Sequence, residues 1–172
     1  MEKKERSTGI ETFKKAIMHR FHEVNAEKGH ILPQAWLTPY LSKNVKQQTF
    51  FELAMQQLQA ENLIEYKAEG HYHIMLTTQG EDYLYPDFKV TNAFLKIRND
   101  VLAKFQANQD KTITFRWLNT HYFGGQLNPK EQRIFNDVID GMIAEKLVTT
   151  SLLNHFLYLT EKGEKLMSES IV

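Results

Sequence analysis

Hydrophobic positions repeat along the chain with the spacing of half-buried helices. Around residues 8–24, and again around residues 90–105, an apolar residue returns at every third or fourth position, which is typical of an amphipathic helix. Thr8 and Glu11 have the spacing of a capping box, which predicts that the first helix begins near Thr8. The apolar positions are Ile10, Phe13, Ile17, Phe21 and Val24, and then Val90, Phe94, Ile97, Val101 and Phe105.

A further helical pattern in each half begins after an asparagine. Asn44 and Asn128 suit the N-cap position, and Gln47 and Glu131 stand three residues later, where their side chains can reach back to the cap. Pro129 falls at the first helical position, where no backbone N–H is needed. The apolar positions of the two helices align, which predicts the same buried face in both. They are Phe50, Phe51, Ala54, Met55 and Leu58, and Ile134, Phe135, Val138, Ile139 and Met142.

Each of these helices is followed by a pattern typical of a two-stranded hairpin. Two short apolar or alternating runs flank a turn in each half, and Gly70 and Asn154 suit the positive φ that a tight turn needs. The runs are 63–68 with 71–76, and 147–152 with 155–160. A last helix is expected to begin near Thr77 in the first half and near Thr160 in the second.

A tryptophan-leucine pair stands earlier in each half, after a short apolar stretch. The stretches are residues 30–32 and 112–114, and the pairs begin at Trp36 and Trp117. We interpret each pair as part of a short helix, although Pro39 leaves the extent of the first one open. Because the two tryptophans match in position, packing in the core is a better explanation of them than ligand stacking.

The matched elements indicate an internal duplication. Trp36-Leu37, residues 61–64 and residues 76–80 recur in the same order at residues 117–118, 145–148 and 159–163. The offsets differ by only a few residues, and an insertion near Gly124-Gly125, where we expect a flexible turn, explains most of the drift. Two copies are too few for a solenoid, so we expect two similar domains, 1–86 and 87–172, with the boundary at Pro86.

The order of elements in each half resembles a known DNA-binding arrangement. Each hairpin begins at Leu63-Ile64 or Leu147-Val148 and ends in Leu-Thr-x-x-Gly, at residues 76–80 and 159–163. These endings resemble those of the MarR- and PadR-type bacterial regulators. The resemblance implies a mainly α fold with small β hairpins (α+β), built as two tandem winged-helix domains, and it implies a small bacterial transcription regulator.

The resemblance also implies which residues would meet duplex DNA, because in such domains the third helix enters the major groove and the hairpin touches the backbone. In the first half these residues are Lys43, Lys46, Gln48, Thr49, Gln56, Lys67 and His71. In the second half they are Lys130, Gln132 and Arg133. Asp137 and Asp140 lie on the same predicted helix face and would repel phosphates, so the first half is expected to be the better DNA reader.

An alternative is a protein-interaction module. Leu152, Leu153 and Phe156 make the second hairpin almost uncharged, which suits a protein partner or a homodimer better than DNA. Tandem winged helices also resemble the kite subunits of bacterial chromosome-condensation complexes, whose paired domains bind other proteins. The same residues could instead fold back onto their own domain, and the sequence leaves both possibilities open.

The charge of the chain bears on whether its partner is DNA or another protein. The chain has 172 residues, with 21 Lys and Arg against 21 Asp and Glu, so its formal net charge is zero. Residues 1–86 carry 10 Lys and Arg against 11 Asp and Glu, and residues 87–172 carry 11 against 10. A DNA-binding protein usually has a basic footprint, so any excess of positive charge must be local.

The sequence predicts no enzyme, no cofactor, no metal site and no membrane segment. The chain has no Cys, which excludes disulfides, thiolate metal sites and cysteine nucleophiles. His19 with Glu23, and His71 with His73, are pairs of metal-binding types, but two ligands do not complete a site. No phosphate-binding loop, nucleophile elbow or dinucleotide-binding glycine pattern occurs. No apolar stretch is long enough to span a membrane or to act as an export signal, so a cytoplasmic location is expected.

Overall fold

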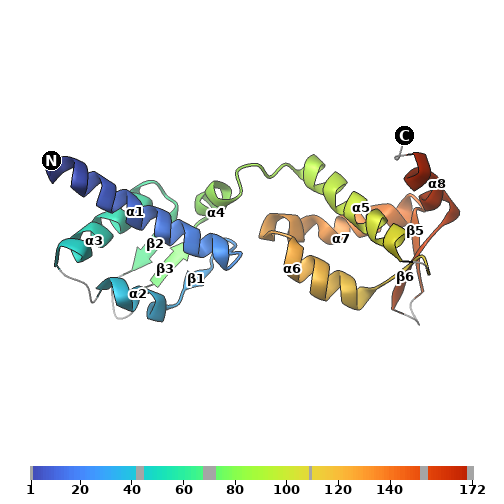
Figure 1. Ribbon diagram of the computed structural model, residues 1–172, viewed down its shortest axis with the longest axis horizontal. Coiled ribbons are helices and arrows are strands. Elements are labelled where there is room, and N and C mark those ends of the chain that lie inside the picture. The colour runs from blue at the N-terminus through green and yellow to red at the C-terminus, as the bar shows by residue number, and fades with distance from the viewer. Residues whose placement is uncertain (1, 42–44, 68–72, 109, 152–154, 170–172) are drawn as a thin grey trace. The chain divides into compact units, whose positions relative to one another are not determined.

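The chain divides into two compact units, Met1–Pro86 (unit 1) and Asp87–Val172 (unit 2). The computed structural model describes residues 2–41, 45–67, 73–108, 110–151 and 155–169 (Figure 1). Each unit has its own hydrophobic core: one core cluster draws only on residues 13–84 and the other only on residues 94–167. The chain is mainly helical with two small antiparallel sheets, which confirms the predicted α+β class at this level.

Unit 1 contains four helices and three strands among its described residues. They are α1 (Glu2–Glu23), β1 (Ile31–Leu32), α2 (Gln34–Leu41), α3 (Val45–Ala60), β2 (Ile64–Lys67), β3 (His73–Leu76) and α4 (Thr78–Leu84). The sheet has the order β1-β3-β2 and all its pairs are antiparallel. The hairpin β2–β3 therefore places its second strand in the middle, between the first strand of the unit and its own partner.

Unit 2 repeats this plan. Its elements are α5 (Val90–Ala107), β4 (Thr112–Thr114), η1 (Trp117–Phe123), α6 (Gly124–Gln126), α7 (Pro129–Ala144), β5 (Val148–Ser151), β6 (Phe156–Leu159) and α8 (Glu161–Glu169). Its sheet order, β4-β6-β5, is the counterpart of the order in unit 1. In each sheet the middle strand pairs with both others, Ile74 opposite Leu32 and Leu157 opposite Ile113.

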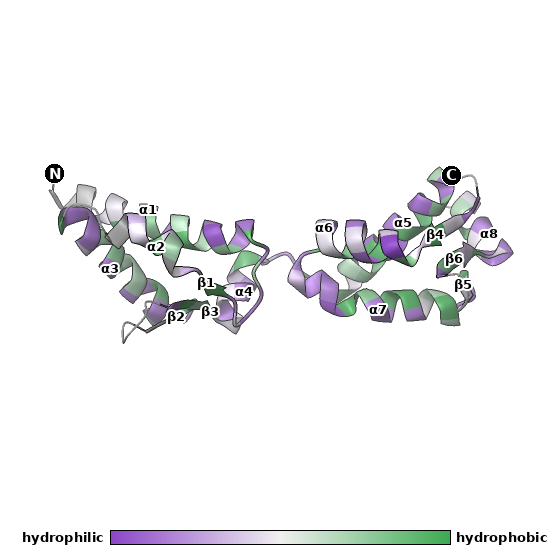
Figure 2. Ribbon diagram, turned by 90° about the horizontal axis from the view of Figure 1, so that it is seen from below, coloured by the Kyte–Doolittle hydropathy of each residue, from purple (hydrophilic) through white to green (hydrophobic). Residues whose placement is uncertain are grey.

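The predicted apolar stripes form the two cores. Ile17 and Phe21 of α1 are completely buried, as are Ile97 and Val101 of α5. Four of the five predicted positions in each of α3 and α7 are buried and match between the units, while Phe50 and Ile134 are half-buried. The buried ones are Phe51, Ala54, Met55 and Leu58, and Phe135, Val138, Ile139 and Met142. Figure 2 shows hydrophobic and hydrophilic residues alternating along the helices of each unit, as expected for amphipathic helices. Val90 departs from the prediction: it is 58% exposed because it opens α5, at the end of the apolar stripe.

Matched polar contacts lock the first and third helices of each unit together. Lys14 of α1 forms an ion pair of 2.5 Å with Glu61, directly after α3. In unit 2, Arg98 of α5 forms an ion pair of 3.3 Å with Glu145, directly after α7. The two acids and the two bases each lie 84 positions apart in the sequence, so the pair is a duplicated feature.

The Leu-Thr-x-x-Gly ending has a structural reason that is the same in both units. Thr77 caps α4, since its Oγ1 accepts a hydrogen bond from the N–H of Gly80, and the same hydroxyl donates to the carbonyl of Asn62 at 2.5 Å. Gly80 packs so closely that a Cβ there would lie 2.0 Å from the carbonyl oxygen of Leu63. Thr160 and Gly163 repeat these contacts, and a Cβ on Gly163 would lie 2.3 Å from the carbonyl oxygen of Leu147.

Two local predictions are wrong. The Thr8–Glu11 capping box does not form, because α1 already begins at Glu2 and Thr8 lies inside it. The Glu, Lys and Arg residues before Thr8 favour helix, so the helix starts earlier. Gly124-Gly125 is no flexible turn either: the second helix of unit 2 continues through it as α6, after a seven-residue π-helical segment. The wider π-helical turn accommodates the residues inserted relative to unit 1.

Candidate nucleic-acid interface

The packing of α3 fixes which of its faces points outward. Phe51, Met55 and Leu58 of α3 are buried in the core of unit 1. Phe13 of α1 meets the edge of the Phe51 ring with centroids 5.8 Å apart. Gly9 lets the two helices approach, because a Cβ there would lie 2.4 Å from the ring of Phe50. With one face held in this way, the opposite face of α3 is presented to solvent.

Helix α3 carries four of the predicted DNA-binding residues, three of them on its outer face. Lys46, Thr49 and Gln56 are exposed, and Gln48 is half-buried. The Lys46 ammonium lies 5.9 Å from the centroid of the Phe50 ring. The Thr49 hydroxyl donates to the carbonyl of Val45 at 2.9 Å. The structure therefore brings these four side chains to one helix, as the sequence predicted.

Val45 belongs to the same face, although the sequence pattern did not predict it as a site residue. It is the first residue of α3 and its exposed fraction is 80%, the highest among the exposed large apolar residues. Its counterpart in unit 2 is Pro129, which is buried. The signal in the sequence was an apolar residue directly after a predicted cap, outside the apolar stripe of the helix.

One acid, Glu52, also lies exposed on α3. Its Oε1 accepts a hydrogen bond of 3.1 Å from the Gln48 amide nitrogen, one helical turn earlier. The carboxylate and the amide therefore hold each other along the helix surface.

The remaining predicted residues of unit 1 flank α3. Lys43 and His71 lie outside the described residues, and so do Leu152 and Leu153 of unit 2. Lys67 is the last residue of β2 and pairs with His73 in the register of the hairpin. The hairpin register thus places residue 67 directly opposite His73, which is exposed.

In unit 2 the predicted DNA-binding residues are used differently. The Gln132 amide donates to two backbone carbonyls, those of Phe123 at 3.1 Å and Leu127 at 3.0 Å, at the end of the preceding helix. Gln132 therefore fixes the turn before α7 instead of facing outward. The Lys130 ammonium lies 5.5 Å from the centroid of the Phe88 ring. Arg133 is exposed, but Asp137 and Asp140 are exposed on the same helix.

The start of α7 is held by a polar network. Asn128 and Glu131 form the predicted capping box, with both reciprocal hydrogen bonds at 3.0 Å. Glu131 is buried, and its second carboxylate oxygen accepts from the Lys96 ammonium at 2.7 Å. The Asn128 cap confirms the sequence prediction, whereas the partner from α5 could not be read from local spacing.

An aromatic group fixes the second helix of unit 2. The Tyr122 hydroxyl donates to Asp100 of α5 at 2.8 Å, and burial together with this hydrogen bond raises the pKa of the Tyr122 phenol. Trp117 stacks on the Tyr122 ring with centroids 5.6 Å apart, and the Lys104 ammonium lies 5.0 Å from the Trp117 ring. Both tryptophans pack against the cores of their units, which is the structural role that the sequence favoured.

Phe156 lies on the outer side of the second sheet. It alternates along β6 with Leu157, which is completely buried, and stands opposite the exposed Thr114. Tyr158 lies on the same side, with its ring centroid 6.3 Å from that of Phe156. Both rings are half-buried, so this face of unit 2 is aromatic and uncharged.

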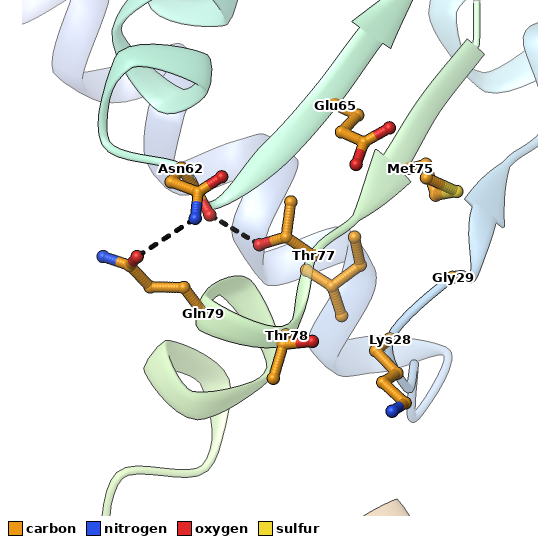
Figure 3. Close-up of a pocket in the computed structure, with 9 residues that line it drawn as sticks. Lys28, Gly29, Asn62, Glu65, Met75, Thr77, Thr78 and Gln79 are labelled. Carbon is orange, nitrogen blue, oxygen red and sulfur yellow. Dashed lines mark hydrogen bonds between the residues drawn. The ribbon is translucent and has the colours of Figure 1, made fainter.

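Unit 1 has an open pocket where β3 meets α4, next to the hairpin base (Figure 3). Lys28, Glu65 and Met75 line it, together with residues 77–79. Figure 3 shows Thr77 directed at the carbonyl of Asn62, and the Asn62 amide directed at Gln79, 3.3 Å away. The polar groups at its centre thus hold α4 to the turn after α3.

Nothing in the described residues builds a metal site: no three His, Cys, Asp or Glu side chains gather closely enough to hold an ion. His19 and Glu23 lie 3.4 Å apart on the exposed surface of α1. In the described part of the chain, no helix combines the length and apolar character needed to cross a bilayer. No protein-family model, curated protein or solved structure matches this chain.

Proposed function

We propose that each unit is a winged-helix domain and that the chain binds duplex DNA by placing α3 in the major groove. The order of elements in unit 1 supports this: a helix, a strand, two helices and a hairpin, with the sheet order β1-β3-β2. A helix of this kind fits the major groove of B-DNA, which is about 12 Å wide. The proposal makes the protein a small regulator of transcription.

The observation that carries the proposal is the outer face of α3. Lys46, Thr49 and Gln56 are exposed there, together with Val45, and none of these four is acidic. Glu52, the one acid of the helix, is also exposed on this face and keeps its charge while it accepts from Gln48, so α3 presents one carboxylate where α7 presents two. In such domains the third helix reads base edges with its outward side chains, and glutamine, threonine and lysine are residue types that do so.

Unit 1 is the better reader of the two. The exposed face of α7 places Asp137 and Asp140 beside Arg133, and these carboxylates would approach phosphates of the same sign. Gln132 already donates both of its hydrogen bonds within the unit. The proposal therefore assigns DNA reading to α3 and not to α7.

The neutral composition determines the expected strength of binding. With equal numbers of acidic and basic residues, the chain can neutralise only a few phosphates through local cations such as Lys46. Each neutralised phosphate contributes about −0.9 to the slope of log K against log salt. We expect measurable binding at low salt and a shallow but non-zero slope.

The test measures binding of the full chain to random-sequence duplex DNA by fluorescence anisotropy, across a series of salt concentrations. Binding that weakens as salt rises would support the proposal. No binding at low salt, or binding independent of salt, would overturn it.

A pair of variants tests the choice of helix. Lys46→Ala with Gln48→Ala should weaken DNA binding more than Arg133→Ala, with Lys165→Ala on the exposed surface of α8 as the control. The reverse order would show that α7 is the reading helix.

A second candidate function is a protein contact through unit 2. Phe156 and Tyr158 favour it, because they form an uncharged aromatic face on the outer side of the sheet, away from the core residue Leu157. Aromatic residues are enriched at protein interfaces. The partner would be another protein or a second copy of the chain.

Light scattering and affinity capture test this second function. The double change Phe156→Thr and Tyr158→Thr keeps residue types that suit strands but removes both rings. It should reduce self-association or partner capture while leaving the circular dichroism spectrum unchanged. An unaltered mass and an unaltered set of captured proteins would exclude the aromatic face as an interface.

A further inference from the structure

The outer face of α3 has a chemical character that is more specific than DNA binding. Val45, Thr49, Glu52 and Gln56 lie almost in line along the helix, because steps of three, four and seven residues return to the same side. Val45 and Thr49 are separated by about 6 Å along the axis. That distance is close to two base-pair steps of about 3.4 Å each.

The first part of this line presents methyl groups. Val45 is 80% exposed and carries two of them. The hydroxyl of Thr49 donates to the carbonyl of Val45 at 2.9 Å, so its methyl is the group left for an outward contact. Apolar contact of this kind recognises the C5-methyl of thymine, which marks A·T pairs in the major groove.

The rest of the line carries Glu52 and Gln56. Gln56 is exposed, and a glutamine amide pairs with adenine through N6 and N7. Guanine is most often read by a bidentate arginine or lysine. The helix contains no arginine, and its one lysine is Lys46, whose ammonium lies 5.9 Å from the Phe50 ring centroid.

Glu52 is the residue that could favour a G·C pair, since a carboxylate can accept from the cytosine N4 amino group. In the structure its Oε1 accepts from the Gln48 amide at 3.1 Å, and Glu52 is one group that suits G·C against three on the line that suit A·T: Val45, Thr49 and Gln56. The outward groups of α3 therefore match thymine and adenine more closely than guanine and cytosine.

From this chemistry we infer that α3 reads A·T base pairs through the major groove, with Val45 and Thr49 contacting thymine methyls and Gln56 pairing with adenine. This inference rests on the proposed DNA binding and adds the class of target. It assigns a specificity role to Val45, a residue that carries no charge and no hydrogen-bonding side chain.

The experiment compares the full chain on alternating A·T, G·C and I·C duplexes at one low salt concentration, by fluorescence anisotropy. An I·C pair presents the major-groove edge of G·C but the minor-groove edge of A·T. We expect A·T to bind about tenfold more tightly than G·C, the size of one good base contact, and I·C to behave like G·C.

Two changes in the DNA locate the contacts. Replacing thymine by uracil removes only the C5-methyl, and should weaken binding of the natural chain several-fold but weaken binding of Val45→Ala less, because that variant keeps only the Thr49 contact. Replacing adenine by 7-deazaadenine removes N7, and should weaken the DNA binding of Gln56→Ala less than that of the natural chain. Val90→Ala, at the exposed first residue of α5, and Gln106→Ala, also exposed on α5, are the matched controls.

The outcomes separate this inference from the function on which it rests. Binding with equal affinity for the three duplexes, a preference for G·C, or I·C behaving like A·T would each overturn A·T reading while leaving DNA binding intact. An equal loss on uracil for Val45→Ala and the natural chain would remove Val45 from the contact. No binding to any duplex at low salt would overturn both proposals.

Discussion

The residue type is most constrained at positions that pack directly against the backbone of another segment. Gly80 and Gly163 stand at equivalent positions. Each lies so close to a backbone carbonyl oxygen that a Cβ at that position would overlap it. Neither glycine is needed for a positive φ. The positive φ values at the matching turns belong instead to Asn62 and Lys146, directly before the hairpins.

Gly80→Ala should therefore destabilise unit 1 by about 2–4 kcal/mol, because the added methyl overlaps the Leu63 carbonyl and forces a backbone shift. Urea unfolding followed by Trp36 fluorescence in a Trp117→Phe background measures this, since each unit contains one tryptophan. Gly125→Ala is the control, measured in unit 2 through Trp117 fluorescence in a Trp36→Phe background: a Cβ there meets no atom within 4 Å, and the change should be neutral or slightly stabilising. Equal effects of the two changes would contradict the steric explanation.

Tyr85 links the end of unit 1 to the turn after α1. Its hydroxyl donates to the carbonyl of Ala26 at 3.2 Å, and it lies 3.3 Å from Asn25 Oδ1. Burial, with the carboxylate of Glu81 as a second cause, raises the pKa of the Tyr85 phenol to about 12.

This shift predicts a pH dependence of stability. The unfolded phenol titrates near pH 10. The folded state keeps its proton to higher pH, so the contribution is full below about pH 10 and is lost as the pH rises through about 12. Tyr85→Phe should be less stable than the natural chain at about pH 9 and should lose less stability on going to about pH 11.5. Urea unfolding at the two pH values measures the difference, and a difference that stays constant would exclude Tyr85 as its source.

At the scale of elements, caps and side-chain clamps decide where helices begin and how they meet. Asn128 and Glu131 start α7, and Lys96 ties the same carboxylate to α5. In unit 1 the corresponding cap residue lies outside the described residues, but the pair Lys14–Glu61 holds α1 at the far end of α3. Each unit thus clamps its first helix to its third.

Asn128→Ala should destabilise unit 2 by about 1 kcal/mol, because two backbone N–H groups lose their acceptor. Trp117 fluorescence during urea unfolding in a Trp36→Phe background provides the measurement. Asn136→Ala, at an exposed position in the middle of the same helix, should have little effect or stabilise slightly. A larger cost at Asn136 than at Asn128 would contradict the capping role.

Elements also explain why the two copies differ in surface but not in plan. The buried positions of the α3 stripe, Phe51 to Leu58, all have buried counterparts in α7, whereas the outer faces carry Val45 and Gln56 in one and Asp137 and Asp140 in the other. Core positions in both copies must fill the same volume between a helix and a sheet. Outer positions have no such constraint, so they can acquire different partners.

At the scale of the whole molecule, the chain is two units with separate cores. The buried clusters contain no residue in common, and the division falls between Pro86 and Asp87. A domain of this size buries enough apolar surface to fold alone.

Fragments 1–86 and 87–172 should therefore each fold with a cooperative thermal transition and a dispersed amide NMR spectrum. Under the proposed function, the first fragment alone should retain most of the affinity for A·T duplexes. A fragment that remains unfolded would show that the units depend on each other for stability. Folded fragments that bind equally well would contradict the assignment of DNA reading to α3.

The amino-acid sequence by itself determined the order of elements, the α+β class and the buried faces of the main helices. These follow from local periodicity and capping, as in the Asn128 cap and the Phe51–Leu58 stripe. The duplication strengthened each prediction, since a pattern read in one half could be checked against the other.

Tertiary structure alone decided how the candidate site residues are used. Gln132 was a predicted DNA-binding residue, but carbonyls at the end of the preceding helix occupy its amide. Val45 was overlooked, because its exposure depends on what packs around the start of α3. The insertion in unit 2 became a π-helical segment and not a loop. In each case the deciding contact is made by residues outside the local segment. The periodicity of hydrophobic residues along the chain does not predict such contacts.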